Sequence, residues 1–138
     1  MLRILVIDEE QFVREALQRV LAEFSTVSAT GDVASGLAWL RTSKADLVII
    51  DVVLPAVEGV AAIREIRRDH PATRVIAIAG SGKSGLNSYH PVAISTSAYL
   101  AACTTAGAHG TLAKPFETGE LRDLIRQLCP GAAVSPRA

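Results

Sequence analysis

The chain of 138 residues is short of aromatic residues, cysteines and net charge, and each shortage argues against a class of protein. Three Phe, two Tyr and one Trp offer little stacking surface, and 14 basic residues offset by 14 acidic ones create no basic field, so we expect no direct binding to nucleic acid. Cys103 and Cys129 are too few for a disulfide framework and lack the spacing of metal ligands. We therefore expect them to be reduced thiols that pack as small apolar side chains.

Long hydrophobic runs are also missing. No apolar run approaches the roughly 18 residues that a membrane span needs. The N-terminal run of residues 1–7 is followed at once by acidic residues, which is the wrong pattern for a signal peptide. We therefore expect a cytoplasmic protein without membrane contact, and its length fits one domain rather than a two-domain enzyme.

Acidic residues are absent from one long segment of the chain. Residues 70–116 contain no Asp or Glu, whereas residues 1–69 contain 11 acidic and 8 basic residues. The cations of the acid-free segment are Arg74, Lys83 and Lys114. Any acidic site is therefore expected in the first half of the chain, with one of these three side chains as its partner from the middle.

Hydrophobic periodicity predicts a regular alternation of strands and helices. Short aliphatic or β-branched runs predict strands at residues 3–7, 26–30, 47–50, 75–79 and 111–113. Apolar residues at helical spacing follow each run and predict helices over residues 12–24, 33–40, 60–70, 95–106 and 118–129, with Asp32 as an N-cap and Gly107 as a stop. Such an alternation requires parallel strands with helices on both faces, so the predicted fold class is doubly wound α/β.

Polar side chains follow three of the predicted strands. Asp8 and Glu9 come after the first strand, Asp51 after the third and Lys114 after the fifth, and ligands in doubly wound sheets bind at this edge. Carboxylates that gather at one point need a cation, and such an oxygen-rich set suits Mg²⁺ beside a phosphoryl group. Plainer explanations stay open: charges at a helix N-terminus for the acids, a turn cap for Asp51 and a solvated side chain for Lys114.

Three motifs occupy these strand ends: ILVIDEE at residues 4–10, DVVLPAVEG at 51–59, and AGA with LAKPF at 106–108 and 112–116. With these motifs in this order, the sequence resembles the receiver domain of two-component response regulators over about residues 2–128. The resemblance implies a flavodoxin-like, five-stranded parallel sheet of strand order 2-1-3-4-5. It also implies a receiver domain over residues 1–129, after which we expect a disordered tail at 130–138.

The resemblance assigns roles to individual residues. Asp51 would be the phosphoacceptor, and Lys114 would contact the phosphoryl group, with a cis peptide bond between Lys114 and Pro115. The ligands of a Mg²⁺ ion would be Asp8, Glu9, Asp51 and the backbone carbonyl of Val53.

The implied function is that of a phosphoacceptor in a phosphorelay. The phosphoryl group would come from the phosphohistidine of a histidine kinase or a histidine phosphotransfer protein. The domain would then signal to a downstream protein target through protein contacts. It is not expected to be an enzyme beyond Mg²⁺-assisted phosphorylation and dephosphorylation of itself.

Three residues depart from the pattern of the family. Ala79 stands where the family usually has a Ser or Thr that contacts the phosphoryl group, which leaves Gly80 and Ser81 as possible contacts. Thr111 stands at the switch position, where the family often has an aromatic residue, and Glu9 replaces the more usual Asp. A degenerate receiver that acts as an interaction module without phosphorylation is therefore the alternative.

The segment of residues 80–94 is longer than the roughly 12 residues beyond which loops are uncommon. It is either a mobile lid or partner contact, to which Lys83 would belong, or an irregular solvated loop. Residues 77–84 also fit a relaxed P-loop pattern, but Ala77 stands where that motif needs Gly, so nucleotide binding is a minor alternative.

Overall fold

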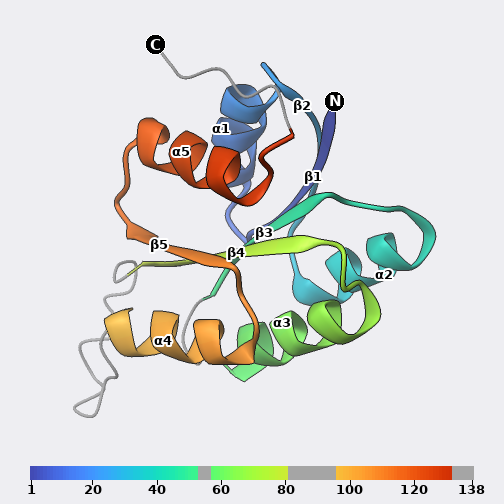
Figure 1. The fold of residues 1–138 in the computed structure, drawn as a ribbon, viewed down its shortest axis with the longest axis vertical. Coiled ribbons are helices and arrows are strands. Elements are labelled where there is room, and N and C mark those ends of the chain that lie inside the picture. Colours follow the sequence, from blue (N-terminus) through green and yellow to red (C-terminus); the bar gives the residue numbers. More distant parts are fainter. Residues whose placement is uncertain (53–56, 81–95, 132–138) are drawn as a thin grey trace.

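The computed structural model describes residues 1–52, 57–80 and 96–131 (Figure 1). Its strands form a single parallel sheet in the order β2-β1-β3-β4-β5, which confirms the predicted class and strand order. The strands are β1 (Leu2–Ile7), β2 (Ser25–Thr30), β3 (Leu47–Asp51), β4 (Arg74–Gly80) and β5 (Gly110–Lys114). The helices are α1 (Gln11–Leu21), α2 (Val33–Thr42), α3 (Val57–Asp69), α4 (Thr96–Ala106) and α5 (Thr118–Leu128).

Helices cover both faces of the sheet, so its central strands are apolar on both sides. Alternate residues of a strand point to opposite faces, and the core is accordingly divided into two clusters. Val48 and Ala77 pack toward α2, α3 and α4, whereas Ile49 and Ile76 pack toward α1 and α5 (Figure 1). This arrangement explains the continuous hydrophobic runs of β1, β3 and β4.

Two of the predicted helix ends are confirmed. The side chain of Asp32 accepts a hydrogen bond from the backbone N–H of Ser35 at 2.7 Å and so caps α2. Gly107 follows α4 with a φ of 120°, a conformation that glycine adopts without strain. Asp32 thus sets where α2 begins after β2, and Gly107 sets where α4 ends before β5.

The prediction for α1 was wrong in two respects. The helix ends at Leu21, and Phe24 is buried from the turn that follows, where its N–H donates to the carbonyl of Leu21 at 3.1 Å. Phe12, the first apolar residue of the predicted helix over residues 12–24, is 71% exposed rather than packed. Periodicity identifies apolar residues, but it does not tell a helix from the turn that continues its apolar face.

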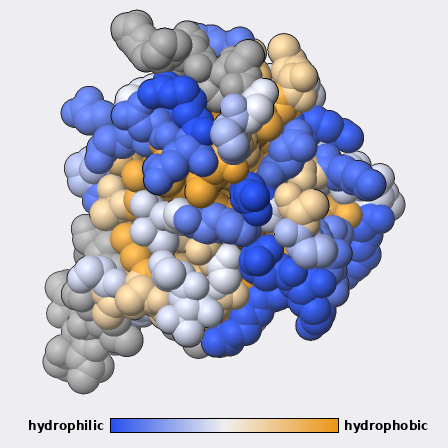
Figure 2. Space-filling view, in the orientation of Figure 1, coloured by the Kyte–Doolittle hydropathy of each residue, from blue (hydrophilic) through white to orange (hydrophobic). Residues whose placement is uncertain are grey.

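The surface over α4 differs from that over the other helices. The sequence of α4 contains no charged residue, and Figure 2 shows pale side chains over α4 beside the hydrophilic ones over α2 and α5.

No helix in the described parts of the chain is long and apolar enough to cross a membrane. The predicted loop at 80–94, apart from Gly80, and the tail beyond Gly131 lie outside the described residues.

Candidate functional site

Three strands deliver charged side chains to the carboxyl edge of the sheet. Asp8 follows β1, Asp51 ends β3, and Lys114 ends β5. The Nζ atom of Lys114 lies 3.2 Å from Oδ1 of Asp51 and 3.7 Å from Oδ2 of Asp8. The structure therefore brings together the two acids and the lysine that the sequence placed on separate strand ends.

The lysine reaches Asp51 across the intervening strand β4. In the register of the sheet, Lys114 pairs with Gly80 and Asp51 pairs with Ile78. A Cβ atom on Gly80 would stand only 3.0 Å from Cδ of Lys114. The absence of a side chain at Gly80 thus leaves space for the stem of the lysine.

Asp8 is held by contacts from three segments. Its N–H donates to the carbonyl of Thr30 at 3.1 Å, and its Oδ1 accepts from the N–H of Glu10 at 2.9 Å. Its carbonyl accepts from Nη1 of Arg14 at 2.7 Å. The side chain is only 3% exposed, so its conformation is closely restricted.

Both acids bind protons more readily than a carboxyl in water does. Burial, with the nearby charge of Asp8 added, raises the pKa of Asp51 to about 6, although Lys114 opposes the rise. Burial likewise raises the pKa of Asp8, against the opposing effects of the Glu10 amide and Lys114. Among the described residues, the two buried carboxylates share the ammonium group of Lys114, so this part of the site has more negative than positive charge.

The residues present fit a Mg²⁺ ion. The Oδ1 atom of Asp51 is buried, and within the described residues its polar partner is the Lys114 ammonium at 3.2 Å, an ion pair that lacks hydrogen-bond geometry. Beside these groups lies a small cavity of about 100 Å³ that Asp8, Glu9, Asp51 and Glu58 help to line. Mg²⁺ is commonly held by one or two carboxylates and several waters, which matches Asp8 and Asp51.

The remaining predicted ligands contribute less. Glu9 is exposed at the rim, and within residues 1–52, 57–80 and 96–131 no three acidic, His or Cys side chains gather closely enough to hold an ion. Val53 lies outside the described residues. Two carboxylates are therefore the protein ligands that the described part of the site offers.

Ala79 and Thr111 occupy the positions at which the sequence departs from the family near the phosphoryl site. Ala79 is 3% exposed at the end of β4 and brings no hydroxyl group to the site. Thr111 is half-buried in β5 opposite Ala77, and Ser81 lies outside the described residues. The peptide bond between Lys114 and Pro115 is cis.

The P-loop alternative receives no support from β4. Ala77 is fully buried in the middle of the strand, so no glycine-rich turn begins there.

Two residues near the site, Arg14 and Glu58, were missed in the sequence analysis. The position of Arg14, six residues after Asp8 and within the following helix, was the available signal.

Comparisons with known proteins agree with this geometry. The family described as the response regulator receiver domain matches residues 4–126. The response regulator GacA of Pseudomonas viridiflava is 36% identical over 81 residues, which cover 56% of this chain and 38% of GacA. The response regulator UvrY of Escherichia coli K12 is 25% identical over 134 residues, which cover 95% of this chain and 56% of UvrY. The match thus spans 38% of the length of GacA and 56% of the length of UvrY, which is less than two thirds of either relative.

Solved structures show the same fold. A response regulator from Thermotoga maritima has a TM-score of 0.76 at 23% identity, covering 94% of this chain and 98% of its own. The receiver domain of NtrX from Brucella abortus has a TM-score of 0.76 at 25% identity, covering 92% of this chain and 98% of its own. The chain therefore belongs to the family of response regulator receiver domains, which supports a phosphoacceptor role in two-component signalling.

Proposed function

We propose that the receiver domain, over residues 1–129, takes a phosphoryl group from a phosphohistidine onto Asp51 with the help of Mg²⁺. Asp8 and Asp51 would hold the ion together with the carbonyl of Val53, and Lys114 would contact the phosphoryl group. The observation that carries the proposal is the cluster of the buried Asp51 and Asp8 carboxylates around the Lys114 ammonium, in which Oδ1 of Asp51 pairs with Nζ of Lys114 at 3.2 Å without hydrogen-bond geometry.

Phosphoryl transfer needs Asp51 as a carboxylate. With a pKa of about 6, most of the side chain is ionised at pH 7 even without a metal. A carboxylate oxygen forms the new bond to phosphorus while the bond from phosphorus to the imidazole nitrogen breaks, and the imidazole leaves with the electron pair. The product on Asp51 is an acyl phosphate.

The positive charges of the site offset the charge that the phosphoryl group brings. The ammonium of Lys114 lies between the two carboxylates and is in place before transfer, so no reorganisation is needed at the moment of reaction. When bound, Mg²⁺ supplies further charge to the carboxylate and phosphoryl oxygens. Lys114 therefore acts as a fixed point charge rather than as an acid or base.

A groove beside the site supports a protein as the phosphoryl donor. The groove has a volume of about 590 Å³ and runs from Asp51 and Lys114 between α1 and the start of α5. Its lining is largely apolar and includes the exposed ring of Phe12 and the ring of Phe116. A histidine kinase or histidine phosphotransfer protein that packs on this groove would bring its phosphohistidine to Asp51, and the signal would then pass to a downstream protein.

A second candidate is an interaction module that works without phosphorylation. Ala79 favours it, because no hydroxyl at the end of β4 can bind the phosphoryl group and report its presence. Under this alternative, Asp51 and Lys114 remain an ion pair and the surface of the domain is constant.

Incubation with acetyl phosphate and Mg²⁺ separates the two candidates. We expect a phosphoryl adduct by mass spectrometry in the wild type, no adduct in Asp51→Asn, and a normal adduct in Asp46→Asn, a matched change at the other edge of the sheet. Beryllofluoride with Mg²⁺ should raise the melting temperature of the wild type but not that of Asp51→Asn. A wild type with neither adduct nor beryllofluoride response would contradict the proposal and favour the interaction module.

A further inference from the structure

Arg14 connects helix α1 to the turn that carries the acids. It is the fourth residue of α1, and its Nη1 donates to the carbonyl of Asp8 at 2.7 Å. Hydrogen bonds from a charged donor are shorter and stronger than those between neutral groups. A strong contact thus spans six residues and reaches the backbone of a buried acid.

The chain after β2 leaves space for this guanidinium group. A Cβ atom on Gly31 would stand 3.1 Å from Nη1 of Arg14, so the side chain lies close against Gly31. The neighbouring Thr30 accepts the N–H of Asp8 at 3.1 Å. The carbonyl and the N–H of Asp8 are therefore both fixed, one by α1 and the other by the end of β2.

The orientation of Asp8 depends on this fixed turn. One carboxylate oxygen, Oδ1, already accepts the N–H of Glu10 at 2.9 Å, and the other, Oδ2, faces Lys114 at 3.7 Å. A rotation of the Asp8 backbone would turn Oδ2 away from Asp51 and Lys114. A residue that holds the carbonyl of Asp8 thereby holds the oxygen that points into the site.

We propose that Arg14 is a positioning residue that orients the Asp8 carboxylate for Mg²⁺ through its hydrogen bond to the Asp8 carbonyl. The inference rests on the proposed function, because the orientation of Asp8 matters for phosphorylation only if the ion binds there. Arg14 itself touches neither the ion nor the phosphoryl group.

The test combines two variants, Arg14→Ala and Arg14→Gln, with the control Arg19→Ala, which removes an exposed arginine from the last turn of the same helix. Mg²⁺ is titrated into the full chain by calorimetry. Because groups that orient metal ligands are typically worth at least tenfold in metal affinity, we expect about tenfold weaker binding in both Arg14 variants and no change in Arg19→Ala. The rate of phosphorylation by acetyl phosphate should require about tenfold more Mg²⁺ for half-saturation, with an unchanged plateau.

A second readout does not depend on the metal. In Mg²⁺-free protein, the N–H of Asp8 should exchange with deuterium faster in both Arg14 variants than in the wild type and in Arg19→Ala. Circular dichroism verifies the fold, and Arg14→Gln, which keeps a polar side chain of good helix propensity, carries the test if Arg14→Ala unfolds.

Two further outcomes are distinguishable. Unchanged Mg²⁺ affinity and unchanged Asp8 exchange in the Arg14 variants would overturn the inference and leave the proposed function intact. A wild-type protein that binds no Mg²⁺ would overturn the proposed function, and with it the role of Arg14 toward the ion.

Discussion

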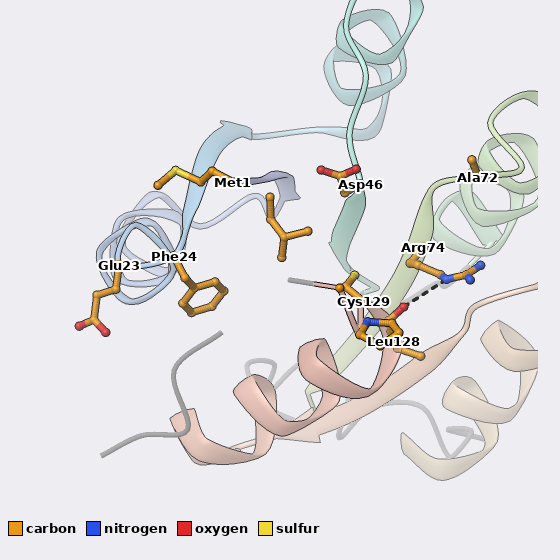
Figure 3. Close-up of a pocket in the computed structure, with 11 residues that line it drawn as sticks. Met1, Glu23, Phe24, Asp46, Ala72, Arg74, Leu128 and Cys129 are labelled. Atoms are coloured by element: carbon orange, nitrogen blue, oxygen red, sulfur yellow. Dashed lines mark hydrogen bonds between the residues drawn. The ribbon is translucent and has the colours of Figure 1, made fainter. Parts of the chain in front are cut away.

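The two edges of the sheet are both hollowed, but they differ in the charged side chains that the described residues place there. At the carboxyl edge, a cavity of about 100 Å³ lies beside Asp8 and Asp51, and a groove of about 590 Å³ is lined by Asp51 and Lys114. At the opposite edge, a pocket of about 710 Å³ lies between the ends of β1, α1, β4 and α5, lined by residues that include Phe24, Asp46 and Arg74 (Figure 3). The larger hollow is thus far from the site that the family uses.

Polar groups at the opposite edge are paired. Asp46 accepts the N–H of Arg3 on its Oδ2 and the N–H of Arg74 on its carbonyl, each at 2.9 Å. Arg74 donates from Nε to the carbonyl of Leu128 at 3.3 Å, the dashed contact in Figure 3. At the carboxyl edge, by contrast, burial raises the pKa of both acids. The comparison teaches that two adjacent buried carboxyls of raised pKa, rather than the volume of a cavity, mark the functional site.

The largest expected effect comes from removing the lysine of the carboxyl edge. Lys114→Ala should lower the rate of phosphorylation by acetyl phosphate by about 10²–10³-fold, the usual cost of losing one charge-stabilising group in a reaction. Rates are followed by mass spectrometry at saturating Mg²⁺. Lys44→Ala, an exposed lysine before β3, serves as the control and should react like the wild type. Equal rates in the two variants would remove Lys114 from the site.

The second prediction concerns the free energy of unfolding, which should rise when an acid is removed from the carboxyl edge and fall when one is removed from the opposite edge. A rise in the pKa of Asp51 from 3.8 to about 6 costs the folded protein up to about 3 kcal/mol at pH 7. Asp51→Asn should therefore increase the free energy of unfolding of Mg²⁺-free protein by up to that amount, whereas Asp46→Ala should lower it by about 1 kcal/mol through loss of a hydrogen bond.

Urea denaturation in EDTA measures both changes. The folded protein binds more protons than the unfolded chain between pH 3.8 and about 6, because the pKa of Asp51 is raised. Its stability relative to Asp51→Asn is consequently lost as the pH rises through this window, and the difference between the two proteins should vanish near pH 4. A destabilised Asp51→Asn at pH 7 would contradict the electrostatic account of the site.

Most of the fold was predictable because each strand carries its own signal. The buried runs of β1 and β3 end abruptly in Asp8 and Asp51, and the topology of parallel strands then places these acids at one edge. Lys114 was predictable for the same reason, although not its reach across Gly80, which depends on the register of β4 and β5. An apolar run that ends in a charged residue thus predicts that this residue lies at the carboxyl edge of the sheet.

Contacts that depend on how one element packs against the next left no such pattern. The bond from Arg14 to the carbonyl of Asp8 depends on the angle at which α1 leaves β1, and the burial of Phe24 depends on a turn that continues the apolar face of a helix. The exposure of Phe12 also became visible only in the structure. The roles of Val53, Ser81 and the segment at 81–94 remain predictions from the sequence.

The smallest expected effect lies at the opposite edge and has the reverse dependence on pH. Nδ1 of His109 accepts the N–H of Val75 at 3.0 Å, and an acceptor nitrogen cannot carry a proton. Burial, together with the charges of Arg67 and Arg74, lowers the pKa of His109 below 6.5. The unfolded chain therefore binds the proton first, so the contribution of His109 is present above pH 6.5 and lost as the pH falls below it.

His109→Asn isolates this effect, because the amide oxygen of Asn can still accept the N–H of Val75 but does not titrate. Between pH 6.5 and 5.5 the wild type should lose stability relative to His109→Asn, by less than about 1 kcal/mol since solvent screens the partly exposed ring. Over the same range Asp51 changes stability in the opposite direction, so denaturation of both single variants and the double variant separates the two edges. Parallel pH profiles for the wild type and His109→Asn would show that only the carboxyl edge responds to protons.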